Sequence, residues 1–86
     1  MKAIGYKYAG PVDGNGALQM IDMQSPKIGP HDLLVAVKGI SVNPVDVKLR
    51  AARAPEDVSG VLGFDAAGTV VEVGSEVSRY AVGDDV

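Results

Sequence analysis

The sequence has no cysteine and a single histidine, His31, among its 86 residues. Disulfide bonds, thiolate catalysis and cysteine-based zinc sites are therefore excluded for this chain. Catalytic zinc usually takes three protein ligands rich in histidine and cysteine, and the chain does not supply them. We expect His31 to occupy a turn, because Pro30 precedes it. Serine-based nucleophilic catalysis also lacks support, since only one imidazole is available as a base.

Aromatic residues and basic charge are scarce as well. One Phe, three Tyr and no Trp leave small aliphatic residues to fill the core, which suits pleated sheets. A formal net charge of -3 offers no surplus of cations for a nucleic acid backbone, so we expect no nucleic acid partner. No apolar run approaches the roughly 20 residues of a membrane span, and the start lacks a signal-peptide pattern. We therefore expect no membrane partner and a cytoplasmic location.

Alternating apolar residues predict a mainly β chain. A first strand over residues 2–8 and a second over 18–22 flank a glycine-rich segment, which is typical of a hairpin. Residues 33–42 form the strongest predicted strand, and the Lys38-Gly39 pair within it indicates a bulge or a bend. The pattern and spacing fit a small barrel or sandwich.

A further strand is predicted within residues 63–74, where Thr69, Val70 and Val71 favour an extended backbone. Gly83 and the acids after it then indicate a turn that leads into a new strand at Val86. A strand that begins at the last residue would have no partner in this sequence, so we expect a truncated domain.

One short helix is predicted at the switch after residue 42. Asn43 is a favoured N-cap, Pro44 suits the first helical position, and Asp46 suits the positive end of the helix dipole. The predicted helix runs from Pro44 to about Ala52. Capping alone accounts for Asn43 and Asp46, so the local pattern requires no ligand there.

The two faces of this helix are predicted from its spacing. Val45 and Leu49 lie four residues apart and are expected to face the sheet. Lys48 and Arg50 are expected to point to solvent. With Arg53 they form the only basic cluster, which we interpret as a solvated helix side, the alternative being a contact with a cofactor phosphate or another anion.

Three segments, 40–48, 61–74 and 82–86, resemble the medium-chain dehydrogenase/reductase superfamily, in the order in which that family has them. The resemblance is greatest to the quinone oxidoreductases and the zinc-type alcohol dehydrogenase-like proteins. It implies a GroES-like, partly open β-barrel with one short helix, of which residues 1–86 would be the N-terminal part of the catalytic domain. The Rossmann nucleotide-binding domain of the family is absent from this chain, which has no Gly-x-Gly-x-x-Gly fingerprint.

The resemblance also implies an activity. Such enzymes transfer hydride from NADPH to a quinone or an activated enone or aldehyde, and the protein places the nicotinamide. It implies a small-molecule substrate, NADPH bound mainly by the missing domain, and a homo-oligomer, usually a dimer. The residues alone leave a second hypothesis open, a free-standing GroES-like binding module without catalysis. In either case we expect the 86-residue chain by itself to be inactive.

Individual residues follow from the same resemblance. Asn43 stands where zinc-dependent relatives have their first zinc-binding cysteine, and Phe64 and Asp65 stand where they have a His-Glu pair. No metal, and in particular no zinc, is therefore expected. Lys48 replaces an aromatic residue that lies near the cofactor in some relatives. The resemblance assigns catalysis to Asn43 and Asp46, cofactor binding to Asn43, Pro44, Asp46 and Lys48, and the substrate pocket to Phe64 and Asp65.

Overall fold

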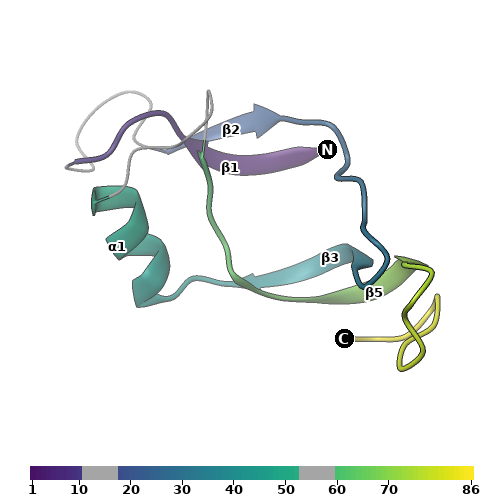
Figure 1. The fold of residues 1–86 in the computed structure, drawn as a ribbon. Coiled ribbons are helices and arrows are strands. Elements are labelled where there is room, and N and C mark those ends of the chain that lie inside the picture. The colour runs from purple at the N-terminus through teal and green to yellow at the C-terminus, as the bar shows by residue number, and fades with distance from the viewer. Residues whose placement is uncertain (11–17, 53–59) are drawn as a thin grey trace. The chain divides into compact units, whose positions relative to one another are not determined.

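A computed structural model describes residues 1–10, 18–52 and 60–86. These residues form five strands and one helix: β1 (Lys2–Tyr6), β2 (Gln19–Asp22), β3 (Leu33–Ser41), α1 (Pro44–Ala52), β4 (Gly60–Val61) and β5 (Asp65–Val73) (Figure 1). The predicted mainly β fold with one short helix is confirmed, and no closed barrel forms among the described residues. No helix among them has the length and apolar character that crossing a membrane requires.

The chain divides into two compact units. The first contains Met1–Gln24 and Val42–Phe64, and the second contains Ser25–Ser41 and Asp65–Val86. The first unit therefore holds β1, β2, β4 and α1, whereas the second holds β3 and β5. Each unit is built from two stretches of chain that are distant in sequence.

The first unit contains a three-stranded antiparallel sheet in the order β2-β1-β4. The predicted pairing of the first two strands is confirmed, with Ile4 opposite Met20. The predicted turn between them falls largely on residues 11–17, which lie outside the described residues. β1 ends at Tyr6, two residues earlier than predicted, at the point where Tyr6 pairs with Gly60, the first residue of β4.

Tyr6 is the buried hydrophobic residue of the first unit among those described. Its ring lies directly over Gly60, where the Cβ atom of any other residue would stand 2.5 Å from Cε1 of the ring. Only glycine leaves room for the ring at that distance. The close approach of Tyr6 and Gly60 therefore joins the end of β1 to the start of β4.

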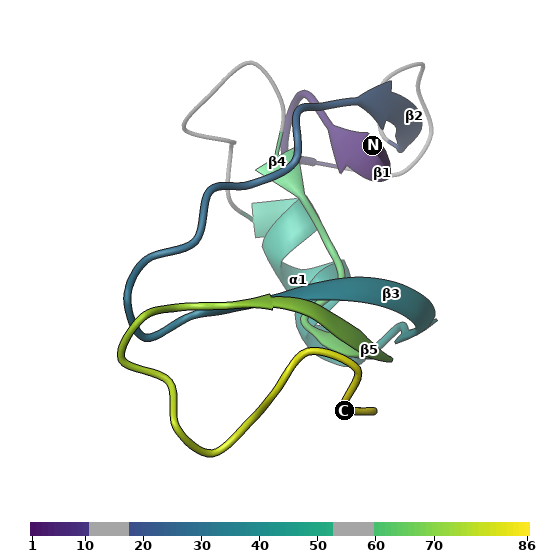
Figure 2. The same ribbon diagram turned by 90° about the vertical axis from the view of Figure 1, so that its right-hand side faces the viewer.

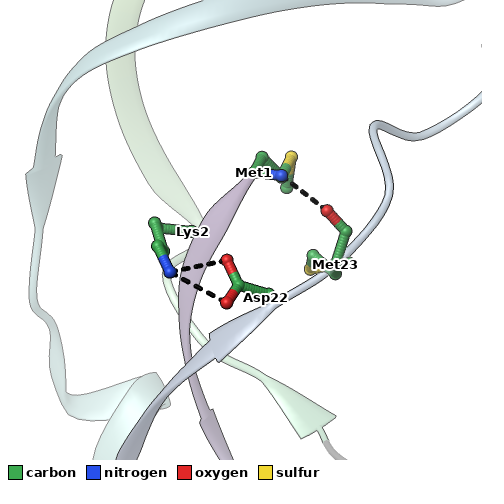
Figure 3. A network of polar contacts seen from close by, with 4 residues as sticks. All are labelled: Met1, Lys2, Asp22 and Met23. Carbon is green, nitrogen blue, oxygen red and sulfur yellow. Dashed lines mark hydrogen bonds and ion pairs between the residues drawn. The ribbon is translucent and has the colours of Figure 1, made fainter.

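Polar contacts close the other end of the β1–β2 pair (Figure 3). Lys2 stands opposite Asp22 in the strand register, and its Nζ lies 2.7 Å from Oδ1 of that carboxylate. The N-terminal amino group of Met1 donates to the carbonyl oxygen of Met23 at 2.6 Å, and the Met23 N–H donates to the Met1 carbonyl at 2.9 Å. The hydrogen-bonded ladder thus extends to the first residue of the chain.

In the second unit β3 and β5 run side by side as an antiparallel pair, from Leu33 opposite Val73 to Ser41 opposite Asp65 (Figure 2). The register shifts between Val37 and Gly39, which confirms the predicted bulge. A second shift, between Leu34 and Val35, was not predicted. Val70 on β5 is the buried hydrophobic residue of this unit among those described.

The last residues of the chain pair with β5. Gly68 and Val86 exchange two backbone hydrogen bonds of 2.9 Å each, and the Val70 N–H donates to the Asp84 carbonyl at 2.9 Å. The hydroxyl of Thr69 also donates to Asp85 Oδ1 at 3.0 Å. The expectation that Val86 begins a strand without a partner is therefore wrong, because the edge of β5 that β3 leaves open accepts it.

Candidate functional site

The predicted site centres on the start of α1, where local sequence fixes the geometry. Asn43 precedes the helix, and Asp46 is its third residue. Oδ2 of Asp46 accepts a hydrogen bond from the Asn43 N–H at 2.8 Å, and the Asp46 N–H donates to the Asn43 carbonyl at 3.0 Å. The acid thus makes the return contact of a capping box, in which the third helical residue binds the N-cap backbone. The predicted helix bounds, Pro44–Ala52, are confirmed.

The second oxygen of the same carboxylate binds a distant part of the chain. Oδ1 of Asp46 accepts a hydrogen bond from the Gly63 N–H at 2.7 Å, across 17 residues of sequence. Asp46 is only 5% exposed. Gly63 adopts a φ of 97°, a value that side-chain-bearing residues rarely take. Asp46 therefore ties the start of α1 to the segment that carries Phe64.

The structure brings some of the predicted site residues together within the first unit. Asn43 is half-buried beside the capping carboxylate, and Phe64 follows Gly63 directly with its side chain 55% exposed. Pro44 and Lys48 are exposed. Asp65 is the first residue of β5 and belongs to the second unit.

The buried face of α1 differs from the prediction. The two buried residues of the helix are Asp46 and Arg50, and Arg50 is only 2% exposed. Val45 is 41% exposed, so its predicted burial and the predicted exposure of Arg50 are both wrong. Lys48 is exposed as predicted. The hydrogen bond to Gly63 turns the Asp46 face inward, and a residue four positions later on a helix shares that face.

Sequence reasoning assigned no site role to Gly63 and placed Arg50 in solvent. A usable signal for Arg50 was its spacing of four residues from a capping acid, which places both on one side of the helix. No local signal identifies Gly63 as the second partner of Asp46, because that contact depends on the tertiary path of the chain.

The residues that stand where zinc-dependent relatives bind zinc do not offer the usual zinc ligands. Asn43 offers an amide, Phe64 offers no donor atom, and the chain contains no cysteine. Within residues 1–10, 18–52 and 60–86, no group of three or more His, Cys, Asp or Glu side chains is placed to hold a metal ion. His31 is exposed, lies at a turn as predicted and belongs to the second unit.

Comparison with known proteins decides the family. The family model of the alcohol dehydrogenase GroES-like domain matches residues 29–86. The chain belongs to this family. A zinc-type alcohol dehydrogenase-like protein of Staphylococcus epidermidis is 44% identical over the whole chain, which covers 25% of that protein. The chain thus spans about a quarter of the length of the relatives it matches.

Solved structures agree with this assignment. A protein assigned as a zinc-dependent alcohol dehydrogenase from Rhizobium etli CFN 42 aligns with a TM-score of 0.93 at 42% identity, over 99% of this chain and 25% of the other. Escherichia coli quinone oxidoreductase, solved in complex with NADPH, aligns with a TM-score of 0.81 at 29% identity, over 99% of this chain and 26% of the other. The resemblance to both groups and the GroES-like fold are confirmed.

Proposed function

We propose that residues 1–86 form the N-terminal part of the catalytic domain of a zinc-independent, NADPH-dependent oxidoreductase that reduces quinones or activated enones and aldehydes. The observation that carries the proposal is the pair of hydrogen bonds through which Asp46 joins the backbone of Asn43 to that of Gly63, the residue before Phe64. Neither Asn43 nor Phe64 is a usual zinc ligand. Support also comes from the similarity to a quinone oxidoreductase that binds NADPH.

The reaction needs few chemical groups from the protein. Bound NADPH would supply the hydride, and a quinone that took up this hydride and one proton from solvent would become the hydroquinone, with NADP⁺ as the other product. The task of the chain is to place the two reactants, because a correctly oriented pair reacts far faster than a free one. The side chain of Asn43 both donates and accepts hydrogen bonds and suits the orientation of a ribose or a carbonyl oxygen.

Asp46 acts in this proposal as a positioning residue. Its two carboxylate oxygens already accept backbone hydrogen bonds, at 2.8 Å from Asn43 and 2.7 Å from Gly63. A carboxylate held in this way, and only 5% exposed, is poorly placed to pass a proton to a substrate. Its contribution is to hold Asn43 and the segment next to Phe64 in a fixed relation.

The remaining predicted residues take binding roles in the same proposal. The exposed ring of Phe64 offers an apolar surface to a flat quinone ring, Asp65 keeps the substrate-pocket role that the family resemblance implies, and Pro44 fixes the backbone at the first position of the helix. The exposed cation of Lys48 suits contact with a phosphate group of the cofactor. Most of the cofactor contacts would come from a nucleotide-binding domain outside these 86 residues.

NADPH oxidation by the full-length gene product tests the proposal, with 1,4-benzoquinone, 1,4-naphthoquinone and an alkenal as acceptors, with and without a chelator. We expect turnover that survives chelation and falls in Asn43→Ala, with Lys7→Ala as a matched surface control. Activity lost on chelation would reveal a metal site elsewhere in the protein and overturn zinc independence. No turnover with any acceptor would favour the binding-module hypothesis.

A further inference from the structure

Arg50 is a buried cation without an anion among the described residues. Its side chain is 2% exposed, and this part of the chain provides no hydrogen-bond partner for Nε, Nη1 or Nη2. A guanidinium group stays charged at any pH that proteins tolerate and carries five N–H donors. Burial of such a group without a partner is costly, and buried arginines in proteins are paired.

The nearest acid on the same helix face does not supply this partner. Asp46 lies four residues before Arg50, and the two are the buried residues of α1. However, both oxygens of Asp46 accept backbone N–H groups, from Asn43 and Gly63, and no ion pair joins it to Arg50 in the described part of the chain. Both oxygens of the Asp46 carboxylate are thus occupied at the start of α1. The Arg50 guanidinium, one turn later, has no anion among the described residues.

We propose that Arg50 binds a carboxylate side chain from a part of the protein beyond Val86. Planar carboxylates fit the guanidinium fork through two parallel hydrogen bonds, which makes them its most specific partners. A free anion is a poorer occupant, because a side chain that is 2% exposed is hardly open to solvent. A carboxylate that arrives with its own segment of chain can be buried as the domain folds. The relatives are about four times as long as this chain, so such a segment has a source.

This inference depends on the proposed function in one respect, that the catalytic domain includes chain beyond Val86. It does not depend on enzymatic activity. It makes Arg50 a positioning residue that locks α1, and hence Asn43, onto the rest of the catalytic domain. The rival interpretation is that the acid paired with Arg50 lies within residues 1–86. The two interpretations predict opposite changes in the stability of the 86-residue chain when Arg50 is replaced.

The test substitutes Arg50→Met in two settings, the 86-residue chain and the full-length gene product, with Lys7→Met as the exposed control. In the chain, removal of an unpaired buried charge should raise the urea midpoint. In the full-length protein the same change should lower the melting temperature by several degrees, because the partner carboxylate loses its cation. A lower midpoint in the chain, or no loss in the full-length protein, would overturn the proposal.

Nitrogen-15 NMR of arginine side chains gives a second readout that does not depend on cooperative unfolding. We expect the full-length protein to show a slowly exchanging Nε–H signal that Arg50→Lys removes, and the 86-residue chain to lack it. A single Asp→Asn or Glu→Gln change beyond Val86 should abolish that signal and identify the partner. Abolition by Glu56→Gln or Asp57→Asn instead would overturn the proposal. Neither readout requires turnover, so an inactive gene product would contradict the proposed function alone.

Discussion

Asp46 and Gly63 are joined by a 2.7 Å hydrogen bond from the glycine N–H to carboxylate Oδ1, although 17 residues separate them. The other oxygen of Asp46 binds the Asn43 N–H at 2.8 Å. One buried side chain therefore fixes both the start of the helix and the segment that carries Phe64. The carboxylate of Asp46 thus makes both the local contact that caps α1 and the long-range contact to Gly63.

Asp46→Asn should destabilise the chain by about 1 to 3 kcal/mol. The amide keeps one acceptor oxygen, so one of the two backbone N–H groups loses its partner, and hydrogen bonds to charged groups are stronger than neutral ones. Urea unfolding followed by circular dichroism measures the change. Asp22→Asn, at an exposed carboxylate, serves as the control. Equal effects of the two substitutions would contradict the structural role given to Asp46.

Gly63→Ala should cost about 1 to 3 kcal/mol, because a φ of 97° strains any residue with a side chain. The matched control is Gly39→Ala, since Gly39 has no positive φ and a methyl group there meets no atom within 4 Å. The control should change stability by less than about 1 kcal/mol. A harmless Gly63→Ala would mean that this segment takes another path in solution.

Gly74→Ala should destabilise the second unit by about 1 to 3 kcal/mol. A methyl group on Gly74 would stand 2.4 Å from the carbonyl oxygens of both Gly29 and Pro30, which are backbone atoms and cannot rotate away. Hydrogen exchange should report the loss as faster exchange of the Glu76 N–H, which donates to Pro30 O at 2.8 Å. Unchanged protection of the Glu76 N–H would show that the close approach of Gly29 and Pro30 to Gly74 does not stabilise this segment.

Lys2→Ala should change the free energy of unfolding by less than about 1 kcal/mol, despite the short contact drawn in Figure 3. The side chains of Lys2 and Asp22 are 67% and 74% exposed, so water and salt screen their attraction. Thermal melts at low and high salt, with and without the substitution, measure the effect. A loss of more than about 2 kcal/mol would indicate that this pair is shielded in solution.

Prediction from sequence succeeded where the signal was local. The Asn-Pro-Val-Asp run carried an N-cap, a first-turn proline and a capping acid within four residues, and α1 has the predicted bounds. The Lys38-Gly39 pair marked a real register shift in β3. These features depend on residues that are neighbours in the chain, so no knowledge of the fold was needed.

Prediction failed where the outcome depended on contacts between residues that are far apart in the sequence. Val45 was expected to face the sheet because it lies four residues before Leu49, yet Asp46 and Arg50 are the buried residues of α1. The Gly63 N–H binds Asp46 and turns that face of the helix inward. The strand at Val86 was expected to lack a partner, yet the open edge of β5 accepts it. Neither outcome can be read from periodicity, which describes one segment at a time.

The sequence by itself determined a mainly β chain with one capped helix, the lack of cysteine ligands for zinc, and the resemblance to the GroES-like family. Only the tertiary structure decided which helix face is buried, which backbone group takes the second oxygen of Asp46, and that Arg50 lies inside without an anion among the described residues. The physical reason is the range of the interactions. Caps and bulges follow from neighbouring residues, whereas burial and long-range hydrogen bonds depend on which segments the folded chain brings together.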